Sequence, residues 1–163
     1  MKNNLILSIL IFFCFQNLAL SQGFNFKGSN IEILNKGNQI NANKGKAFSS
    51  DNNFEISSDK FEYFKDKGIL KSIGNGLVII KSEKLEIKYD NAIFNQKNST
   101  FEANGNVEIF QVNENFIIKN NKIIYDQKNN IVSSDDTTRI EDKFANIYFV
   151  DSFKFEINQN LIK

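Results

Sequence analysis

The chain has 163 residues, 41% of them hydrophobic, and a formal net charge of +1, which suits one domain with a targeting segment. The chain has no histidine, which excludes Ser-His-Asp triads and imidazole metal ligands. Its single cysteine excludes internal disulfides and four-thiolate zinc sites, and we expect no metal ion and no cofactor. The 20 basic residues barely outnumber the 19 acidic ones, so we expect no nucleic-acid partner, whereas 17 phenylalanines can build a core.

Residues 1–21 have the layout of a secretory signal peptide. Lys2 precedes an apolar run over residues 5–15, and Ala19-Leu20-Ser21 provides a small-x-small cleavage site. The apolar run is shorter than the roughly 20 residues that span a membrane. We therefore expect residues 1–21 to be cleaved and residues 22–163 to form a secreted domain. An uncleaved membrane anchor is the alternative.

Apolar and polar residues alternate along most of residues 24–157, and residues 85–89 and 101–109 are the clearest examples. This period of two predicts half-buried β-strands. A motif of the form apolar-x-apolar-x-x-polar-x-apolar-x-apolar also recurs about every 31 residues. Its copies begin at Phe24, Phe54, Leu85, Phe116 and Tyr148, and the last copy has lost the polar residue. Nine phenylalanines occupy inward positions of the repeat: Phe24, Phe26, Phe54, Phe61, Phe94, Phe101, Phe116, Phe153 and Phe155.

Each complete unit predicts two strand stretches joined by a polar hairpin. A polar residue at Asp59, Asp90 and Asn121 breaks the alternation, which is typical of a bend or bulge, and Gly74 and Gly105 serve the same backbone geometry. Because no unit can bury its apolar face alone, the units must assemble into one sheet system. The fifth unit lacks a second half, so we expect an unprotected strand edge there. The predicted turns are 65–68, 95–98 and 127–130.

Two stretches carry a family resemblance. Residues 103–109 read Ala-Asn-Gly-Asn-Val-Glu-Ile, a form of A-x-G-N-V, and residues 123–126 read Ile-Ile-Tyr-Asp before a polar turn and a returning strand. With these motifs the chain resembles the OstA-like, or LptA-type, periplasmic lipopolysaccharide-transport proteins over residues 24–157. Gly76 and Asp136 depart from the family's pattern, so we expect the second and fourth units to be weaker.

The resemblance implies an all-β fold: an open, V-shaped antiparallel β-jellyroll built from two-strand repeats of about 31 residues. It implies a non-enzymatic protein that shields the acyl chains of lipopolysaccharide in an apolar groove and bridges the inner and outer membranes. The implied partners are lipopolysaccharide, further copies of the chain stacked head to tail through terminal strand edges, and the jellyrolls of inner-membrane and outer-membrane components.

The candidate lipid-binding residues are large or branched side chains at inward positions of the repeat, where a plain β-core is the alternative interpretation. They are Ile56, Phe61, Tyr63, Leu85, Ile87, Phe94, Phe101, Val107, Ile109, Phe116, Ile118 and Tyr125. Four further apolar residues break the alternation and would pack on a second face or at an edge: Phe64, Phe110, Ile117 and Ile124.

Other functions stay open on the sequence alone. The chain could be the jellyroll portion of the outer-membrane assembly protein, the anchored inner-membrane partner, or a secreted β-repeat adhesin. An enzyme would have to use carboxylates, as glycosidases do. The densest acidic group is Asp135, Asp136, Glu141 and Asp142. Lys81, Lys84 and Lys88 could meet lipid phosphates, although a solvated strand face is the default for such lysines.

Overall fold

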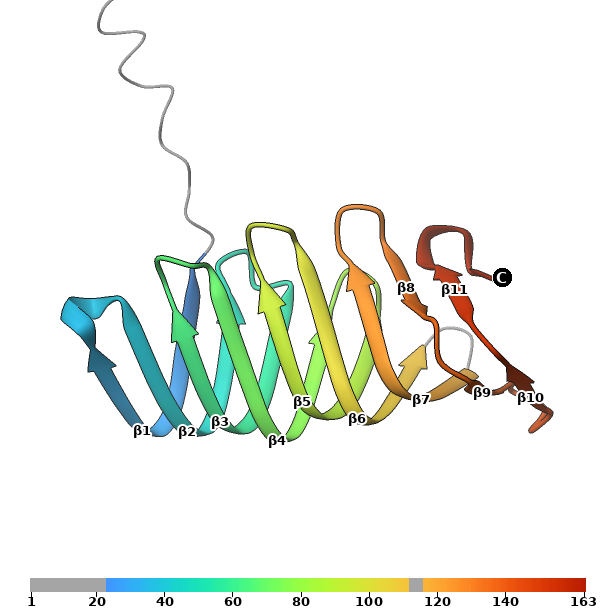
Figure 1. Cartoon of the computed structure of the whole chain (residues 1–163), viewed down its shortest axis with the longest axis horizontal. Coiled ribbons are helices and arrows are strands. Elements are labelled where there is room, and N and C mark those ends of the chain that lie inside the picture. Colours follow the sequence, from blue (N-terminus) through green and yellow to red (C-terminus); the bar gives the residue numbers. More distant parts are fainter. Residues whose placement is uncertain (1–22, 112–115) are drawn as a thin grey trace, which may run out of the picture.

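The computed structural model describes residues 23–111 and 116–163, so the predicted signal peptide lies outside the described residues. The described residues form one open antiparallel sheet of twelve strands (Figure 1). Strands β1 to β8 follow in sequence order, β11 and β12 continue beside β8, and β9 pairs with β7 and β10. The bounds are β1 Phe24–Leu34, β2 Gln39–Ser49, β3 Phe54–Phe64, β4 Ile69–Ile80, β5 Leu85–Asn95, β6 Thr100–Gln111, β7 Phe116–Asp126, β8 Ile131–Ser134, β9 Thr138–Glu141, β10 Ile147–Val150, β11 Phe153–Glu156 and β12 Leu161–Ile162.

A crease crosses the middle of every long strand. The pairing register shifts between Ser57 and Lys60 in β3, and corresponding shifts occur in β4, β5 and β6. Asp59 accepts a hydrogen bond from Asn75 Nδ2 at 2.7 Å across this bulge, and Gly74 beside it has a φ of +78°. A Cβ on Gly74 would lie 2.8 Å from Asp59 Oδ2, so the bend requires glycine there. The predicted bend positions are confirmed.

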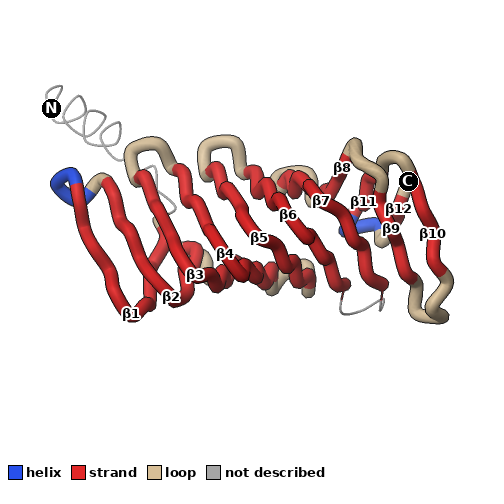
Figure 2. The backbone as a smooth tube through the Cα atoms, turned by 60° about the horizontal axis from the view of Figure 1, so that its bottom comes forward, coloured by secondary structure: helices blue, strands red, loops and turns tan. Residues whose placement is uncertain are grey.

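The crease divides the sheet into two wings, and the strands run from one wing to the other. The hairpins after β3, β5 and β7 rise at the top of Figure 1, and Figure 2 shows the strands side by side from β1 to β10. Here the first wing means residues 24–28, 45–49, 54–58, 76–80, 85–89, 107–111, 116–120 and 138–150. The second wing means residues 30–34, 39–43, 60–64, 69–73, 91–95, 100–104, 122–126, 131–134 and 153–162.

The core lies between the wings because every second residue of each strand points inward. In β5, Leu85, Ile87 and Tyr89 are buried, whereas Glu86 and Lys88 face outward. The buried hydrophobic residues of all the long strands form one cluster. Lysine and glutamate pair across strands on the outer face, as Glu108 does with Lys119 at 3.0 Å. This all-β, open antiparallel jellyroll confirms the predicted fold class.

The repeat is less regular at its C-terminal end than in the middle. In the fourth unit, β8 ends at Ser134 before Asp136, and β9 resumes at Thr138. In the second unit, β4 crosses Gly76 without interruption. A Cβ on Gly76 would lie 2.0 Å from the Tyr89 ring, so the glycine makes room for this large inward side chain. The departure from the family's pattern at Gly76 therefore allows the Tyr89 ring to pack, whereas the departure at Asp136 coincides with the interruption between β8 and β9.

Candidate functional site

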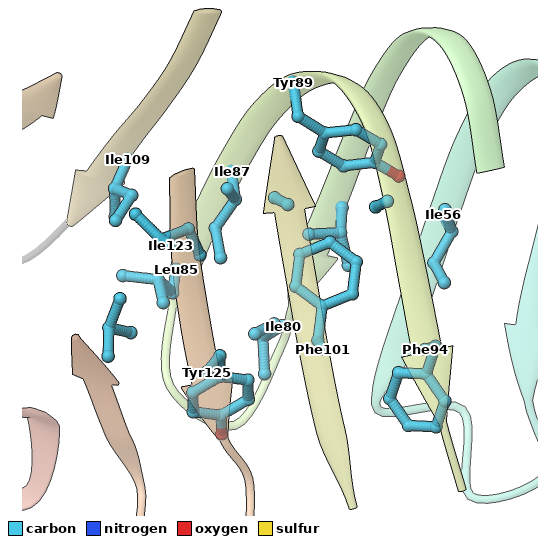
Figure 3. Packing of buried hydrophobic residues seen from close by; sticks show 14 of the residues in the cluster. Ile56, Ile80, Leu85, Ile87, Tyr89, Phe94, Phe101, Ile109, Ile123 and Tyr125 are labelled. Atoms are coloured by element: carbon cyan, nitrogen blue, oxygen red, sulfur yellow. The ribbon is translucent and has the colours of Figure 1, made fainter. Parts of the chain in front are cut away.

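The space between the wings collects all the residues predicted to bind lipid. Each of the twelve is at most 9% exposed, and most are near zero. Ile87 and Ile109 lie in the first wing and Phe101 and Tyr125 in the second, and their side chains point into the same interior (Figure 3). The structure thus brings the whole predicted set together along one continuous apolar interior.

Aromatic rings join the two wings throughout this interior. All eight ring pairs found among the described residues connect a first-wing residue with a second-wing residue. Phe94 packs edge-on against both Phe24 and Phe54 at centroid distances of 5.2 Å, and Phe116 meets Phe155 at 5.1 Å. Edge-to-face contacts at these distances are favourable beyond the area they bury. The interior is therefore filled by side chains in this conformation.

We use the word mouth for the line, opposite the crease, where the outermost inward residues of the two wings meet. Phe24 and Phe54 start β1 and β3 on the first wing, and Phe94 is the last inward residue of β5 on the second, so their contacts span the mouth. Sequence reasoning placed Phe24 and Phe54 at inward positions but left them out of the candidate lipid set. Their position at the strand starts was the signal, because strand ends lie farthest from the crease.

Two tyrosines place their hydroxyl groups on the second-wing side of the mouth. Tyr63 Oη donates to Gln96 Oε1 at 3.0 Å, and Tyr125 Oη donates to Asn130 Oδ1 at 2.9 Å. Burial raises the pKa of Tyr125, and the Glu83 carboxylate, in the turn after β4 on the first wing, raises it further. The mouth therefore has apolar rings inside and hydrogen-bonding groups at its outer margin.

Polar side chains line the floor of the interior, near the crease. Tyr89 Oη and Ser72 Oγ lie 3.0 Å apart and are both buried, and burial raises the pKa of Tyr89. Asn120 Nδ2 donates to Thr138 Oγ1, and Ser134 Oγ donates to Asn120 Oδ1 at 3.3 Å. These groups satisfy one another, so the floor acts as structural support for the apolar layer above it.

Comparison with known proteins gives a family. The model of the OstA-like proteins matches residues 56–162. The chain belongs to the OstA-like protein family. Its structure is similar to the crystal structure of LptH from Pseudomonas aeruginosa, described as the LptA-homologous periplasmic component of the conserved lipopolysaccharide transport device. The TM-score is 0.62 at 12% identity over 79% of this chain and 94% of LptH, a likeness of fold. No curated protein matches the chain.

The outward apolar residues of this OstA-like protein pack on the outer face. Phe64 lies under two ammonium groups, those of Lys67 and Lys71, at 5.5 and 5.6 Å from the ring centroid. Phe110 and Ile117 are cross-strand neighbours in β6 and β7, and both are half-buried. These contacts agree with the second-face packing that the sequence left open. Ile124 is 40% exposed on the same face.

The two ends of the sheet expose inward-facing apolar side chains. At the β1 end, Ile31 and Ile33 are 42% and 68% exposed, although their cross-strand partner residues in β2 point into the interior. At the other end, Tyr148 of β10 is 51% exposed. Surface depressions of about 310 and 340 Å³ lie at these ends and reach the interior residues Phe24 and Phe116, respectively. In the described residues β1, β10 and β12 each have a strand partner on one side only, and β10 and β12 belong to the fifth unit, where an open edge was expected.

The acidic group considered for an enzyme is not assembled into one site. Asp135 and Asp136 lie at the crease, whereas Asp142 lies beyond β9. Asp142 accepts hydrogen bonds within its own turn, mainly from Asn146, and these hold the pKa of its carboxyl below the usual value. Glu141 pairs with Arg139 at 2.8 Å. Across residues 23–111 and 116–163, no cluster of three or more acidic or cysteine side chains could hold a metal ion, and no helix is long and apolar enough to cross a membrane.

The lysines considered for lipid phosphates lie on the outer face or in a turn. Lys81 is 3.8 Å from Glu55, and Lys88 is 3.7 Å from Glu108. Lys84 lies in the turn between β4 and β5, with a φ of +50°. The two ion pairs belong to the cross-strand charge pattern of the outer face, which supports the solvated-face interpretation of Lys81 and Lys88.

Proposed function

We propose that this OstA-like protein binds the acyl chains of lipopolysaccharide between its two wings and carries them through the periplasm. The observation that supports this most directly is the continuous apolar interior, which all twelve candidate residues share and which reaches the surface at both ends. The family membership and the LptH-like fold agree with the same function. No bond is made or broken in this activity, so it needs neither a nucleophile nor a cofactor.

The energetics favour an exchange of ring contacts for lipid contacts. An acyl chain of about a dozen carbons gains roughly 10 kcal/mol on leaving water, at about 0.8 kcal/mol for each CH₂. The ring pairs that span the mouth contribute about 0.5–1.5 kcal/mol each beyond their buried area. A chain that enters between Phe54 and Phe94 replaces one apolar contact with another, so the wings can separate without exposing the interior to water.

The two free ends support the proposed bridge. A second copy that adds its β1 edge to the β10 end would continue the sheet and cover Ile33 and Tyr148, which are exposed in the single chain. The two edges differ, so the contact is head to tail and does not close on itself. The jellyrolls of inner-membrane and outer-membrane components would engage the two ends of such a stack in the same way.

The proposed compartment depends on residues 1–21, which we propose to be a cleaved signal peptide. Sequencing the N-terminus of the protein isolated from cells tests this directly. A mature chain that starts near Gln22 supports a freely carried periplasmic domain. A chain that retains Met1 contradicts cleavage and favours the membrane-anchored alternative.

Site-specific photo-crosslinking tests the proposed binding site. A photoreactive residue at Ile87, Phe101 or Ile118 points into the interior, and we expect each to capture lipopolysaccharide. Matched positions on the outer face of neighbouring strands, Glu86 and Phe110, should capture little, because alternate residues face away from the interior. Equal crosslinking at inward and outward positions, or none at the inward ones, would refute the interior as the lipid site.

A further inference from the structure

Gln111 places an unpaired polar atom in the apolar interior. It is the last residue of β6, and its side chain is inward, in step with Val107 and Ile109. It is 5% exposed, and its Oε1 has no hydrogen-bond donor among the described residues. A buried acceptor without a partner lowers stability, so each such group calls for a physical explanation.

The row of residues around Gln111 makes its polarity unusual. Its cross-strand neighbours are Leu85 of β5 and Phe116 of β7, both buried. The inward residue at the same place in the preceding repeat is Ile80, which is also fully buried. Leu85, Ile80 and Ile109 point into one packed cluster in Figure 3. Isoleucine therefore satisfies the packing at this position of the repeat, and a glutamine amide adds only the capacity to form hydrogen bonds.

Ser49 provides an internal comparison, because it is a polar residue in the same row. It is 8% exposed, but its hydroxyl donates to Asp51 and accepts from the backbone N–H of Phe54 at 2.9 Å. The turn after β2 thus provides both partners for Ser49. Gln111 Oε1 has no such pairing in the described part of the chain, so it is available to accept a hydrogen bond from a bound molecule.

We propose that Gln111 Oε1 accepts a hydrogen bond from a hydroxyl group carried by a bound acyl chain, close to the chain's polar end. This inference rests on the proposed function, since it assigns a selective contact within the same lipid site. An acceptor can pair only with an O–H or N–H donor, and a hydroxyl is a donor that an otherwise apolar chain can carry into the interior. Gln111 lies in the outermost inward row, at the mouth, so the hydroxyl it meets lies near the headgroup end of the chain.

Competition binding tests this contact. Lauric acid, β-hydroxylauric acid and ω-hydroxylauric acid compete with a fluorescent fatty acid for residues 22–163. We expect β-hydroxylauric acid to bind about three- to tenfold more tightly than lauric acid, the net effect of one hydrogen bond that pairs a buried acceptor. The ω-hydroxy acid should gain nothing, because its hydroxyl would lie deep among apolar side chains.

Two variants isolate the role of the amide. Gln111→Leu should lose the preference for the β-hydroxy acid, bind lauric acid at least as well, and have a higher melting temperature because the unpaired acceptor is gone. Ile80→Leu, in the same row one repeat earlier, should keep the preference. Equal affinity of wild type for the three acids, or a preference that survives in Gln111→Leu, would overturn the inference while leaving the proposed function intact. If none of the acids competes, the inference is overturned, and crosslinking to lipopolysaccharide decides the proposed function separately.

Discussion

Phe94 joins two first-wing rings across the closed mouth. Its ring contacts Phe24 and Phe54 of the opposite wing, both at 5.2 Å, and it is 5% exposed. Truncating a buried phenylalanine to alanine removes about 3–5 kcal/mol, through lost burial and the cavity that remains. We expect Phe94→Ala to lower the free energy of unfolding by that amount. Ile93→Ala is the matched control, because Ile93 precedes it on the same strand, faces outward and is 41% exposed, so its effect should stay below about 1 kcal/mol.

The same position separates stability from access to the interior. Phe94→Leu keeps an apolar side chain but removes both ring pairs across the mouth, which together contribute about 1–3 kcal/mol. If lipid enters by opening the mouth, this variant should take up a fluorescent fatty acid faster, on the order of tenfold. Urea titration gives the free energies of unfolding, and stopped-flow fluorescence gives the uptake rates. Equal destabilisation by Phe94→Ala and Ile93→Ala, or an unchanged uptake rate in Phe94→Leu, would refute the reasoning.

Three further predictions concern packing, pH and assembly. Gly76→Val should destabilise the fold by about 1–3 kcal/mol by overlapping the Tyr89 ring, and adding Tyr89→Asn, which recreates the pair used one repeat later, should recover part of that loss in a double-mutant cycle. A hydrogen bond from the cross-strand Lys119 lowers the pKa of Glu108, so the contribution of Glu108 to stability is complete above about pH 4.5 and is lost as the pH falls through its folded-state pKa. The free energy of unfolding, measured as a function of pH, should therefore fall less steeply at acid pH in Glu108→Gln than in the wild type. Ile33→Glu should abolish self-association in sedimentation velocity at concentrations where the outward-facing control Leu34→Glu still associates.

Much of the fold could be predicted because the repeat encodes it locally. A period of two assigns each side chain to a face, and the break at Asp59 and Asp90 marks the crease, since both carboxylates accept hydrogen bonds from an asparagine across the bulge. The same alternation placed all twelve candidate residues in the interior. These are properties of neighbouring residues, so one sequence is enough to recover them.

Contacts between the wings could not be predicted in the same way. Phe54 meets Phe94 and Tyr125, which lie 40 and 71 residues further along the chain, because the twist and stagger of the sheet decide which rings face each other. The alternation also does not explain why Gly76 and Tyr89 occur together. The reason is that the Tyr89 ring occupies the space that a side chain at position 76 would need, and this contact is seen only in the structure. The unpaired oxygen of Gln111 is likewise visible only once its neighbours are placed in space.

The closed mouth and the proposed lipid site are two consequences of the same composition. An empty slot lined by Phe24, Phe54 and Phe94 would expose apolar surface to water, at a free-energy cost of about 25 cal/mol for each Å². The wings therefore close when no acyl chain lies between them. A lipid that enters must displace these ring contacts, and its net affinity is therefore smaller than the roughly 10 kcal/mol of its own transfer from water. That reduction suits a carrier. A site that bound an acyl chain with the full transfer energy would hold it, whereas the proposed site would recover its own ring contacts by closing behind a departing chain, and would so favour release to the next copy in the proposed stack.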